Sequence, residues 1–87
     1  MEYKQKTGEW FRVNRDKMMI GPDSGGNLKL YASNTADGRV ATSELETLPL
    51  VASVGEIAAP TTIKDIVEGT WFIAVDTTGK THCNIMI

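Results

Sequence analysis

The sequence predicts an all-β fold: a small antiparallel β-barrel or sandwich of five to seven short strands with one short helix. Turn-forming residues recur roughly every 8–12 residues, a spacing typical of such folds. Between them lie short segments that are rich in β-branched and aromatic residues or that alternate apolar with polar side chains. The chain has 87 residues, which predicts a single domain over residues 1–87.

The first half of the chain predicts three short strands. Residues 9–13 (EWFRV) and 17–20 (KMMI) flank a turn at residues 14–16. A glycine-rich loop at residues 21–27 follows. After it, apolar residues alternate with more polar neighbours, as expected of a half-buried strand; the apolar ones are Leu28, Leu30 and Ala32.

The middle of the chain predicts two more strands and the one helix. We expect strands at residues 39–45 and 48–54, the second at a sheet edge because it contains Pro49. The helix is expected at residues 63–68, where Thr62 can cap the N-terminus and Gly69 suits the exit. Its apolar residues would then share one helical face: Ile63, Ile66 and Val67.

The C-terminal residues predict a β-hairpin. Residues 70–76 (TWFIAVD) and 80–87 (KTHCNIMI) have strand composition, and Gly79 suits the turn between them. A three-residue loop would place Asp76 opposite Lys80, a favourable pair of charges. One face of this hairpin would contribute to the core through Trp71, Ile73, Val75, Cys83, Ile85 and Ile87.

The sequence offers few groups for catalysis or for metal binding. Cys83 is the only cysteine, so no disulfide can form within the chain, and His82 is the only histidine. Neighbours on a strand point to opposite faces, so these two side chains do not form a nucleophile–base pair. Glu44 and Glu46 are expected on a charged solvent face rather than in an active site. We therefore expect no enzyme, no cofactor and no metal site.

The charge distribution leaves nucleic-acid binding as an alternative. Nine basic and eleven acidic residues give a net charge of −2, which opposes the electrostatic attraction that usually dominates such binding. Near the N-terminus, however, aromatic residues are interleaved with basic ones, and bases can stack on aromatic rings. The residues concerned are Tyr3, Lys4, Lys6, Trp10, Phe11, Arg12, Arg15 and Lys17.

A structural or assembly role is the main functional expectation. The chain is small, has no staple such as a disulfide, and ends in apolar residues, all of which favour a subunit that packs on itself or on a larger protein assembly. Aromatic residues and methionines are enriched at protein interfaces. The predicted interface residues are Trp10, Phe11, Met18, Met19, Tyr31, Ile85, Met86 and Ile87. The alternative is a small β-barrel module that binds a peptide or single-stranded nucleic acid.

The sequence contains neither a predicted membrane-spanning segment nor a predicted signal peptide, and this indicates where the protein is located. No run of about 18 apolar residues is present, so no membrane association is expected. The first residues, Met1 to Lys4, do not resemble a signal peptide. We expect a protein that is cytoplasmic or virion-associated. In size and general character, though in no motif, it is similar to phage virion accessory proteins such as capsid decoration or head–tail components.

Overall fold

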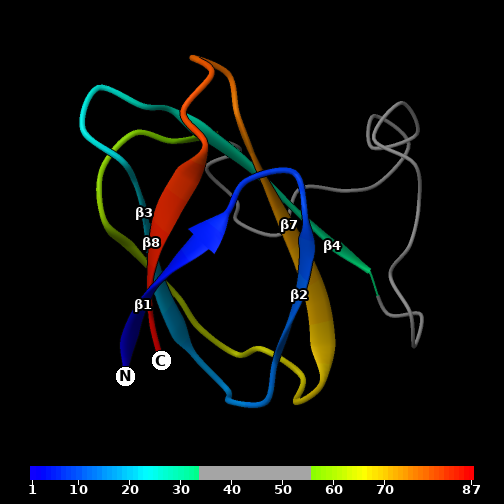
Figure 1. Cartoon of the computed structure of the whole chain (residues 1–87). Helices are drawn as coiled ribbons and strands as arrows, with labels where there is room; N and C mark the ends of the chain where they lie inside the picture. The colour runs from blue at the N-terminus through cyan, green and yellow to red at the C-terminus, as the bar shows by residue number, and fades with distance from the viewer. Residues whose placement is uncertain (34–55) are drawn as a thin grey trace.

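Two four-stranded antiparallel sheets form the part of the protein that the structure, a computed structural model, describes: residues 1–33 and 56–87 (Figure 1). One sheet has the strand order β1-β8-β3-β6 and the other the order β2-β7-β4-β5. The strands are β1 (Glu2–Lys6), β2 (Trp10–Val13), β3 (Met18–Pro22), β4 (Leu28–Ser33), β5 (Glu56–Ile57), β6 (Thr61–Ile63), β7 (Thr70–Asp76) and β8 (His82–Met86).

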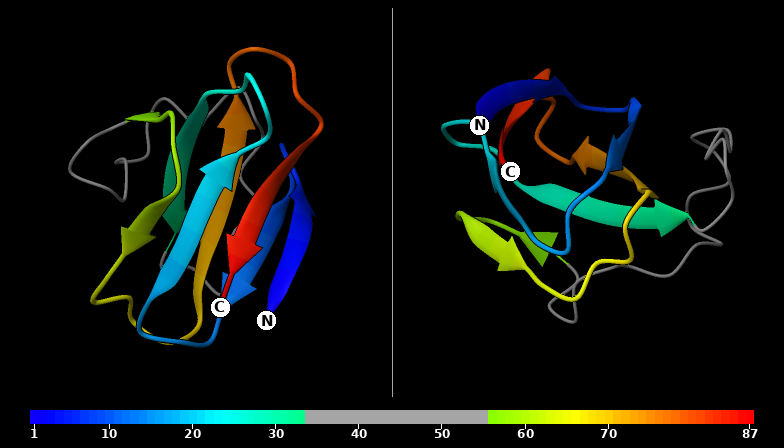
Figure 2. Two further views of the ribbon diagram at one scale, coloured as in Figure 1. Left: turned by 90° about the vertical axis from the view of Figure 1, so that its left-hand side faces the viewer. Right: turned by 90° about the horizontal axis from the view of Figure 1, so that it is seen from below.

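The chain alternates between the two sheets. Apart from β4 and β5, which pair with each other, consecutive described strands belong to different sheets. The sheets lie face to face, with β1, β8, β3 and β6 forming one layer in front of the other (Figure 2, left). The strands β1 and β8 pair along their whole length, so the two ends of the chain lie side by side.

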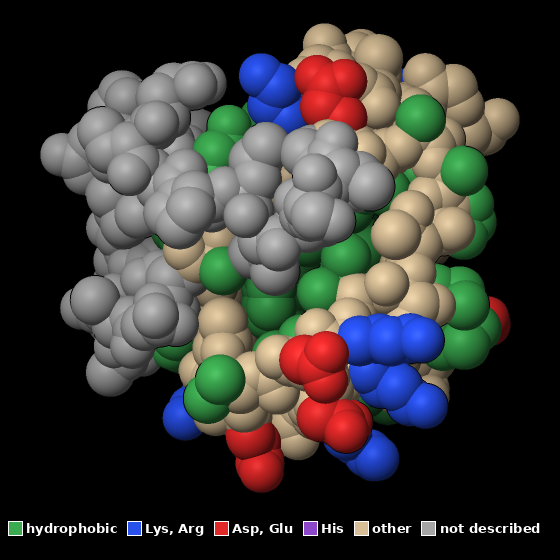
Figure 3. All heavy atoms as spheres, turned by 180° about the vertical axis from the view of Figure 1, so that it is seen from behind, with side chains coloured by type: hydrophobic (Ala, Val, Ile, Leu, Met, Phe, Trp, Pro, Cys, Tyr) green, Lys and Arg blue, Asp and Glu red, His purple; other side chains and the backbone are tan. Residues whose placement is uncertain are grey.

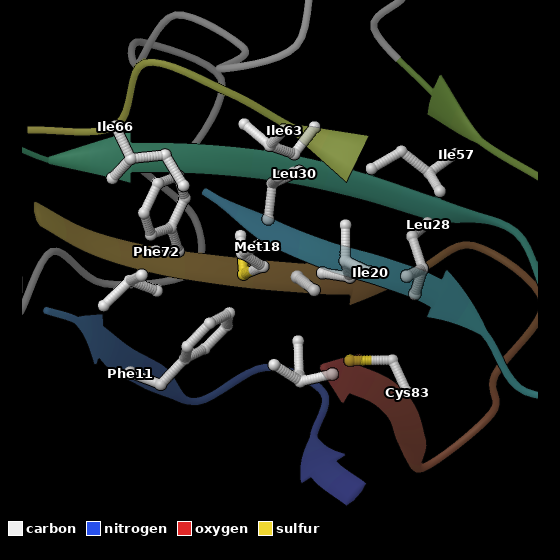
Figure 4. Close-up of a cluster of buried hydrophobic side chains, with 13 residues drawn as sticks. Phe11, Met18, Ile20, Leu28, Leu30, Ile57, Ile63, Ile66, Phe72 and Cys83 are labelled. Carbon is white, nitrogen blue, oxygen red and sulfur yellow. The ribbon is translucent and has the colours of Figure 1, made fainter. Parts of the chain in front are cut away.

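The core lies between the two sheets and is built from alternate residues of each strand. On β4, Leu28 and Leu30 point inward, and on β8, Cys83 and Ile85 do so; each of these side chains is at most 1% exposed. This is the period-two burial expected of strands with one face on a core. Figure 4 shows Leu28, Leu30 and Cys83 in one cluster with side chains from β2, β3 and β7. The rings of Phe11 and Phe72 stack with their centres 6.0 Å apart.

The all-β prediction is confirmed for the described residues, but the predicted number of strands needs correction. The described residues alone contain eight strands rather than the five to seven expected, because β1, β5 and β6 have little strand signal of their own. The two sheets remain separate among the described residues, so they form the two-layer sandwich, one of the two predicted architectures, and not the closed barrel.

The helix predicted at residues 63–68 is wrong. Ile63 belongs to β6 and lies opposite Met18 in the sheet. Asp65 then adopts a φ of 58°, a left-handed conformation that a helix cannot include. The backbone N–H of Ile66 donates to the carbonyl of Asp16 at 2.8 Å. Strand pairing and this distant hydrogen bond therefore replace the local hydrogen bonds of a helix.

The predicted C-terminal hairpin is also wrong, although both of its strands exist. β7 pairs with β2 and β4, whereas β8 pairs with β1 and β3 in the other sheet. The predicted core face is right for Cys83 and Ile85. On β7 it is the opposite face, with Phe72 and Ala74, that joins the main core. Ile73 instead packs with Tyr31 in a second buried cluster on the outer side of its sheet.

Some predictions lie outside the described residues: the strands at residues 39–45 and 48–54 and the charged pair Glu44 and Glu46. The other strands of the first half are confirmed as β2, β3 and β4. The turn at residues 14–16 connects β2 and β3, which do not pair with each other.

Candidate protein-binding site

Two exposed methionines lie next to each other on the outer face of the β1-β8-β3-β6 sheet. Met19 of β3 is directly opposite Met86 of β8 in the antiparallel register. Their neighbours along each strand, such as Ile20 and Ile85, point into the core, so the two methionines must point outward. They are 39% and 41% exposed, which makes them the centre of an apolar patch on an otherwise polar sheet face.

This patch is part of an open groove with a volume of about 410 Å³. Residues from β1, β3 and β8 and the segment before β6 line it, and Figure 2 (left) shows the face on which these strands lie. We call this the methionine groove. Its lining residues are Glu2, Tyr3, Lys4, Met19, Gly21, Pro60, Asn84, Ile85 and Met86.

Gly21 allows Pro60 to close one side of the methionine groove. A Cβ atom at position 21 would lie 3.1 Å from the Cα of Pro60, which is tighter than an ordinary van der Waals contact. The absent side chain thus lets the segment before β6 lie directly against β3. Pro60 itself is exposed, so it adds apolar surface beside Met19.

Polar groups surround the apolar centre of the groove. The Asn84 side-chain amide donates to the carbonyl of Pro22 at 3.3 Å, which holds it against β3. Lys4 Nζ lies 3.8 Å from a carboxylate oxygen of Asp23, and both side chains are largely exposed. An apolar centre with a polar rim is the usual composition of a protein-binding surface.

The predicted interface residues occupy three kinds of position. Met19 and Met86 lie together in the groove, whereas Trp10 and Ile87 are half-buried elsewhere. The remaining four are buried within the chain and have little surface to offer a partner: Phe11, Met18, Tyr31 and Ile85. Trp10 and Tyr31 pack together in the second buried cluster, whereas Phe11 points into the main core, so these three aromatic side chains do not line one groove.

Sequence reasoning missed the other residues of the methionine groove. Nothing in the local sequence connects Pro60 or Glu2 with β3, since strand pairing brings them together from distant parts of the chain. The glycine at position 21, in the middle of an apolar strand, is the one local signal, because glycine in a strand often marks a close approach of another segment.

The potential catalytic groups of β8 are separated, as predicted. Cys83 is fully buried and His82 is exposed on the opposite face. Burial, and then the negative charge of Asp76, raise the pKa of the Cys83 thiol from 9.0 to about 11. The thiol is therefore protonated at neutral pH and is a poor nucleophile. The described residues contain no cluster of His, Cys, Asp and Glu that could hold a metal ion.

A second hollow, of about 420 Å³, contains basic residues. Arg12 and Arg15 line it together with Tyr3 and Ile87. Both arginines are exposed. On the face shown in Figure 3, however, described basic side chains lie next to acidic ones, and they form no broad patch of positive charge there.

Comparisons with known proteins identify no relative that defines a class for this sandwich. No family model matches the chain, and no curated protein and no solved structure matches it either. Within the described residues, no helix is long and apolar enough to cross a membrane. Functional inference therefore depends on the surface chemistry of the chain itself.

Proposed function

We propose that this protein is a non-catalytic structural or assembly protein, a small β-rich subunit that packs on itself or on a larger protein scaffold through the methionine groove. The observation that supports this most is the exposed pair Met19 and Met86 at the centre of the groove. Methionine side chains are flexible and polarisable, so such surfaces adapt well to another protein. A virion accessory subunit of the capsid decoration or head–tail kind is one setting for this role.

The surroundings of the groove support protein binding better than catalysis. Its lining includes no cysteine and no histidine. The charged residues that line it, Glu2 and Lys4, are exposed and have opposite signs. They can form a polar rim around an apolar contact, an arrangement that gives specificity and excludes water around the contact.

The test is the solution mass of the purified protein, measured by light scattering over a hundredfold range of concentration. We expect oligomers that persist at moderate salt, because burial of apolar surface is not screened by ions. In the double variant Met19→Asp/Met86→Asp, charge in the groove should lower the mass. His82→Asp is the matched control, since His82 is exposed on β8 but does not line the groove.

Circular dichroism must show that the double variant remains folded. A folded double variant with the same oligomers as the wild type would contradict assembly through the groove. A wild-type protein that is monomeric throughout would contradict packing on itself. Binding to a scaffold would then be measured between the purified scaffold protein and the wild type, the double variant and the His82→Asp control.

The alternative is a module that binds a peptide or single-stranded nucleic acid. The hollow beside Arg12, Arg15 and Tyr3 is the observation that favours it. Such binding would weaken steeply as salt increases, because cations on the protein replace counterions on the phosphates. Fluorescence anisotropy with a labelled oligonucleotide, with Arg12→Ala/Arg15→Ala as the comparison, distinguishes this function from assembly through the groove.

A further inference from the structure

Within residues 1–33 and 56–87, the strand β1 offers an unpaired backbone edge. It is the outermost strand of the β1-β8-β3-β6 sheet, and no described strand lies beyond it (Figure 2, left). An edge strand presents free N–H and C=O groups that can pair with a further strand. β1 has five residues, whereas the opposite edge strand β6 has three, so β1 is the longer pairing surface of this sheet.

The hydrogen bonds at the two ends of β1 show which of its backbone groups are free. The backbone nitrogen of Ile87 donates to the carbonyl of Met1 at 2.9 Å, and that of Thr7 donates to Thr81 at 3.0 Å. Bonding direction alternates along an antiparallel strand. Tyr3 and Gln5 therefore share the β8 side with Met1 and Thr7, and the edge carries the N–H and C=O groups of Glu2, Lys4 and Lys6. Of these groups, the Lys6 carbonyl accepts a hydrogen bond from the exposed side-chain amide of Gln5 at 3.3 Å, which a paired strand would replace.

The free edge has a charge pattern that is complementary to itself. If a two-fold axis passes at Lys4, Glu2 of one copy lies opposite Lys6 of the other, and the reverse pair forms as well. Opposite charges across neighbouring strands are favourable. The same register also aligns the free backbone groups, because Glu2, Lys4 and Lys6 all face the edge.

The remaining charges along this edge do not oppose the arrangement strongly. Lys4 would face Lys4 of the second copy, but each has Asp23 of its own chain 3.8 Å away as a counter-charge. Lys6 lies 3.9 Å from Glu9 of its own chain. The pair of Lys6 and Glu9 is largely exposed and hence weak, so Lys6 can reorient toward Glu2 of the second copy while Lys4 keeps Asp23 as its counter-charge.

We propose that two copies of this chain form a symmetric dimer by antiparallel pairing of β1 with β1, which creates one continuous sheet through both copies. The two-fold axis is then perpendicular to the sheet, so both methionine grooves lie on the same side. This inference builds on the proposed assembly function, and it adds that the assembling unit is a dimer with two grooves on one face.

Charge reversal tests the register. Glu2→Lys and Lys6→Glu each convert both attractive pairs into repulsive ones, and we expect each to raise the dimer dissociation constant about tenfold or more. An equimolar mixture of the two variants restores both attractive pairs, so light scattering should show a heterodimer. Lys64→Glu is the matched control for Lys6→Glu, because it makes the same charge change at an exposed position outside β1.

Hydrogen exchange tests the backbone pairing independently. In the dimer, the amides of Glu2, Lys4 and Lys6 should exchange slowly. In the Lys6→Glu monomer they should exchange fast, whereas the amides of Tyr3 and Gln5 should remain protected in both. The edge pairing is overturned if the wild type is monomeric, if the single reversals leave the dimer intact, or if the mixture does not restore it.

These outcomes separate the dimer from the assembly function of the groove. Loss of the larger oligomers on mutation of Met19 and Met86, with no effect of Lys6→Glu, which changes β1 but not the groove lining, would overturn the edge pairing and leave the groove function standing. The converse result would retain the β1 dimer and reject assembly through the groove.

Discussion

Asp76 organises the turn between β7 and β8 and thus the crossing from one sheet to the other. One of its carboxylate oxygens accepts hydrogen bonds from the backbone N–H of Thr78 at 2.7 Å and from the Thr78 hydroxyl. Burial acts to raise the pKa of this carboxyl, but hydrogen bonds from Thr78 and from the backbones of Lys80 and Asn27 outweigh it and lower the pKa below 3.8. The ionised carboxylate therefore stabilises the turn at neutral pH.

Gly26 is required where the β3–β4 loop meets this turn. A Cβ atom there would lie 2.5 Å from a carboxylate oxygen of Asp76 and 3.0 Å from the Asp23 carbonyl. We expect Gly26→Ala to reduce the free energy of unfolding by about 1–3 kcal/mol, the usual cost of forcing an extra carbon into a packed site. Urea denaturation measures this. Ser24→Ala, at an exposed position of the same loop, should change it by less than about 0.5 kcal/mol.

The Cys83 thiol should resist modification in the folded protein. It is fully buried, and its pKa is raised to about 11, so at pH 7.5 a thiol reagent finds neither access nor thiolate. We expect modification only on unfolding, with a rate that increases with denaturant. Rapid modification of the native protein would show that β8 opens on its own. Cys83→Ala provides the blank.

Cys83 and Tyr3 make the stability of the protein depend on pH in the alkaline range. Burial raises the pKa of Tyr3 above 10.0, in addition to the shift at Cys83 from 9.0 to about 11. Because the unfolded chain loses these protons first, their contribution to stability is complete below about pH 9 and decreases as pH rises towards 11. Denaturation midpoints between pH 8 and pH 11 should decrease, and Cys83→Ala should reduce that decrease.

At the scale of elements, the segment after β6 shows how distant partners determine local conformation. The N–H of Gly69 donates to the carbonyl of Val13 at 2.8 Å, as that of Ile66 does to Asp16. These bonds attach the segment to the turn between β2 and β3. They place Ile66 in the core at 8% exposure and leave Val67 75% exposed, whereas a helix would have placed both on one face.

Paired substitutions check this arrangement. Val67→Asp should change the free energy of unfolding by less than about 0.5 kcal/mol, since its side chain is in water. Ile66→Asp puts a carboxylate into the core, and we expect a loss of about 3 kcal/mol or more. Thermal denaturation followed by circular dichroism measures both. Equal destabilisation by the two variants would favour a helical face instead.

For the whole molecule, the β1–β8 pairing places the two ends of the chain together. The terminal nitrogen of Met1 lies 2.5 Å from the Ile87 carbonyl oxygen. A short glycine linker between these ends, with a new opening between Gly79 and Lys80, should therefore give a circular permutant that folds, because permutation is tolerated when the ends are adjacent and the opening is in an exposed turn. Circular dichroism and urea denaturation check it, and opening within β8 is the control expected to unfold.

Much of the secondary structure could be predicted because its signal is local. Alternation of apolar and polar residues is present in the sequence whichever strand comes to lie alongside, so β4 and β8 and the inward face of Cys83 and Ile85 could be recognised. The two-residue strand β5 and the edge strand β1 exist mainly because β4 and β8 pair with them. No pattern in the local sequence predicts that pairing.

The sequence by itself determined that the described residues form short β-strands. It also determined that the single cysteine lies on the apolar face of its strand, apart from the single histidine. Only the tertiary structure decided which strands pair. β7 is apolar on both faces, so its pattern does not show which face points inward. Packing against Phe11 determines that the face with Phe72 points into the core. The methionine groove was decided in the same way, since Met19 and Met86 become neighbours only when β3 and β8 pair. Periodicity is a property of one segment of the sequence, whereas strand pairing depends on the free energy of interaction between two segments.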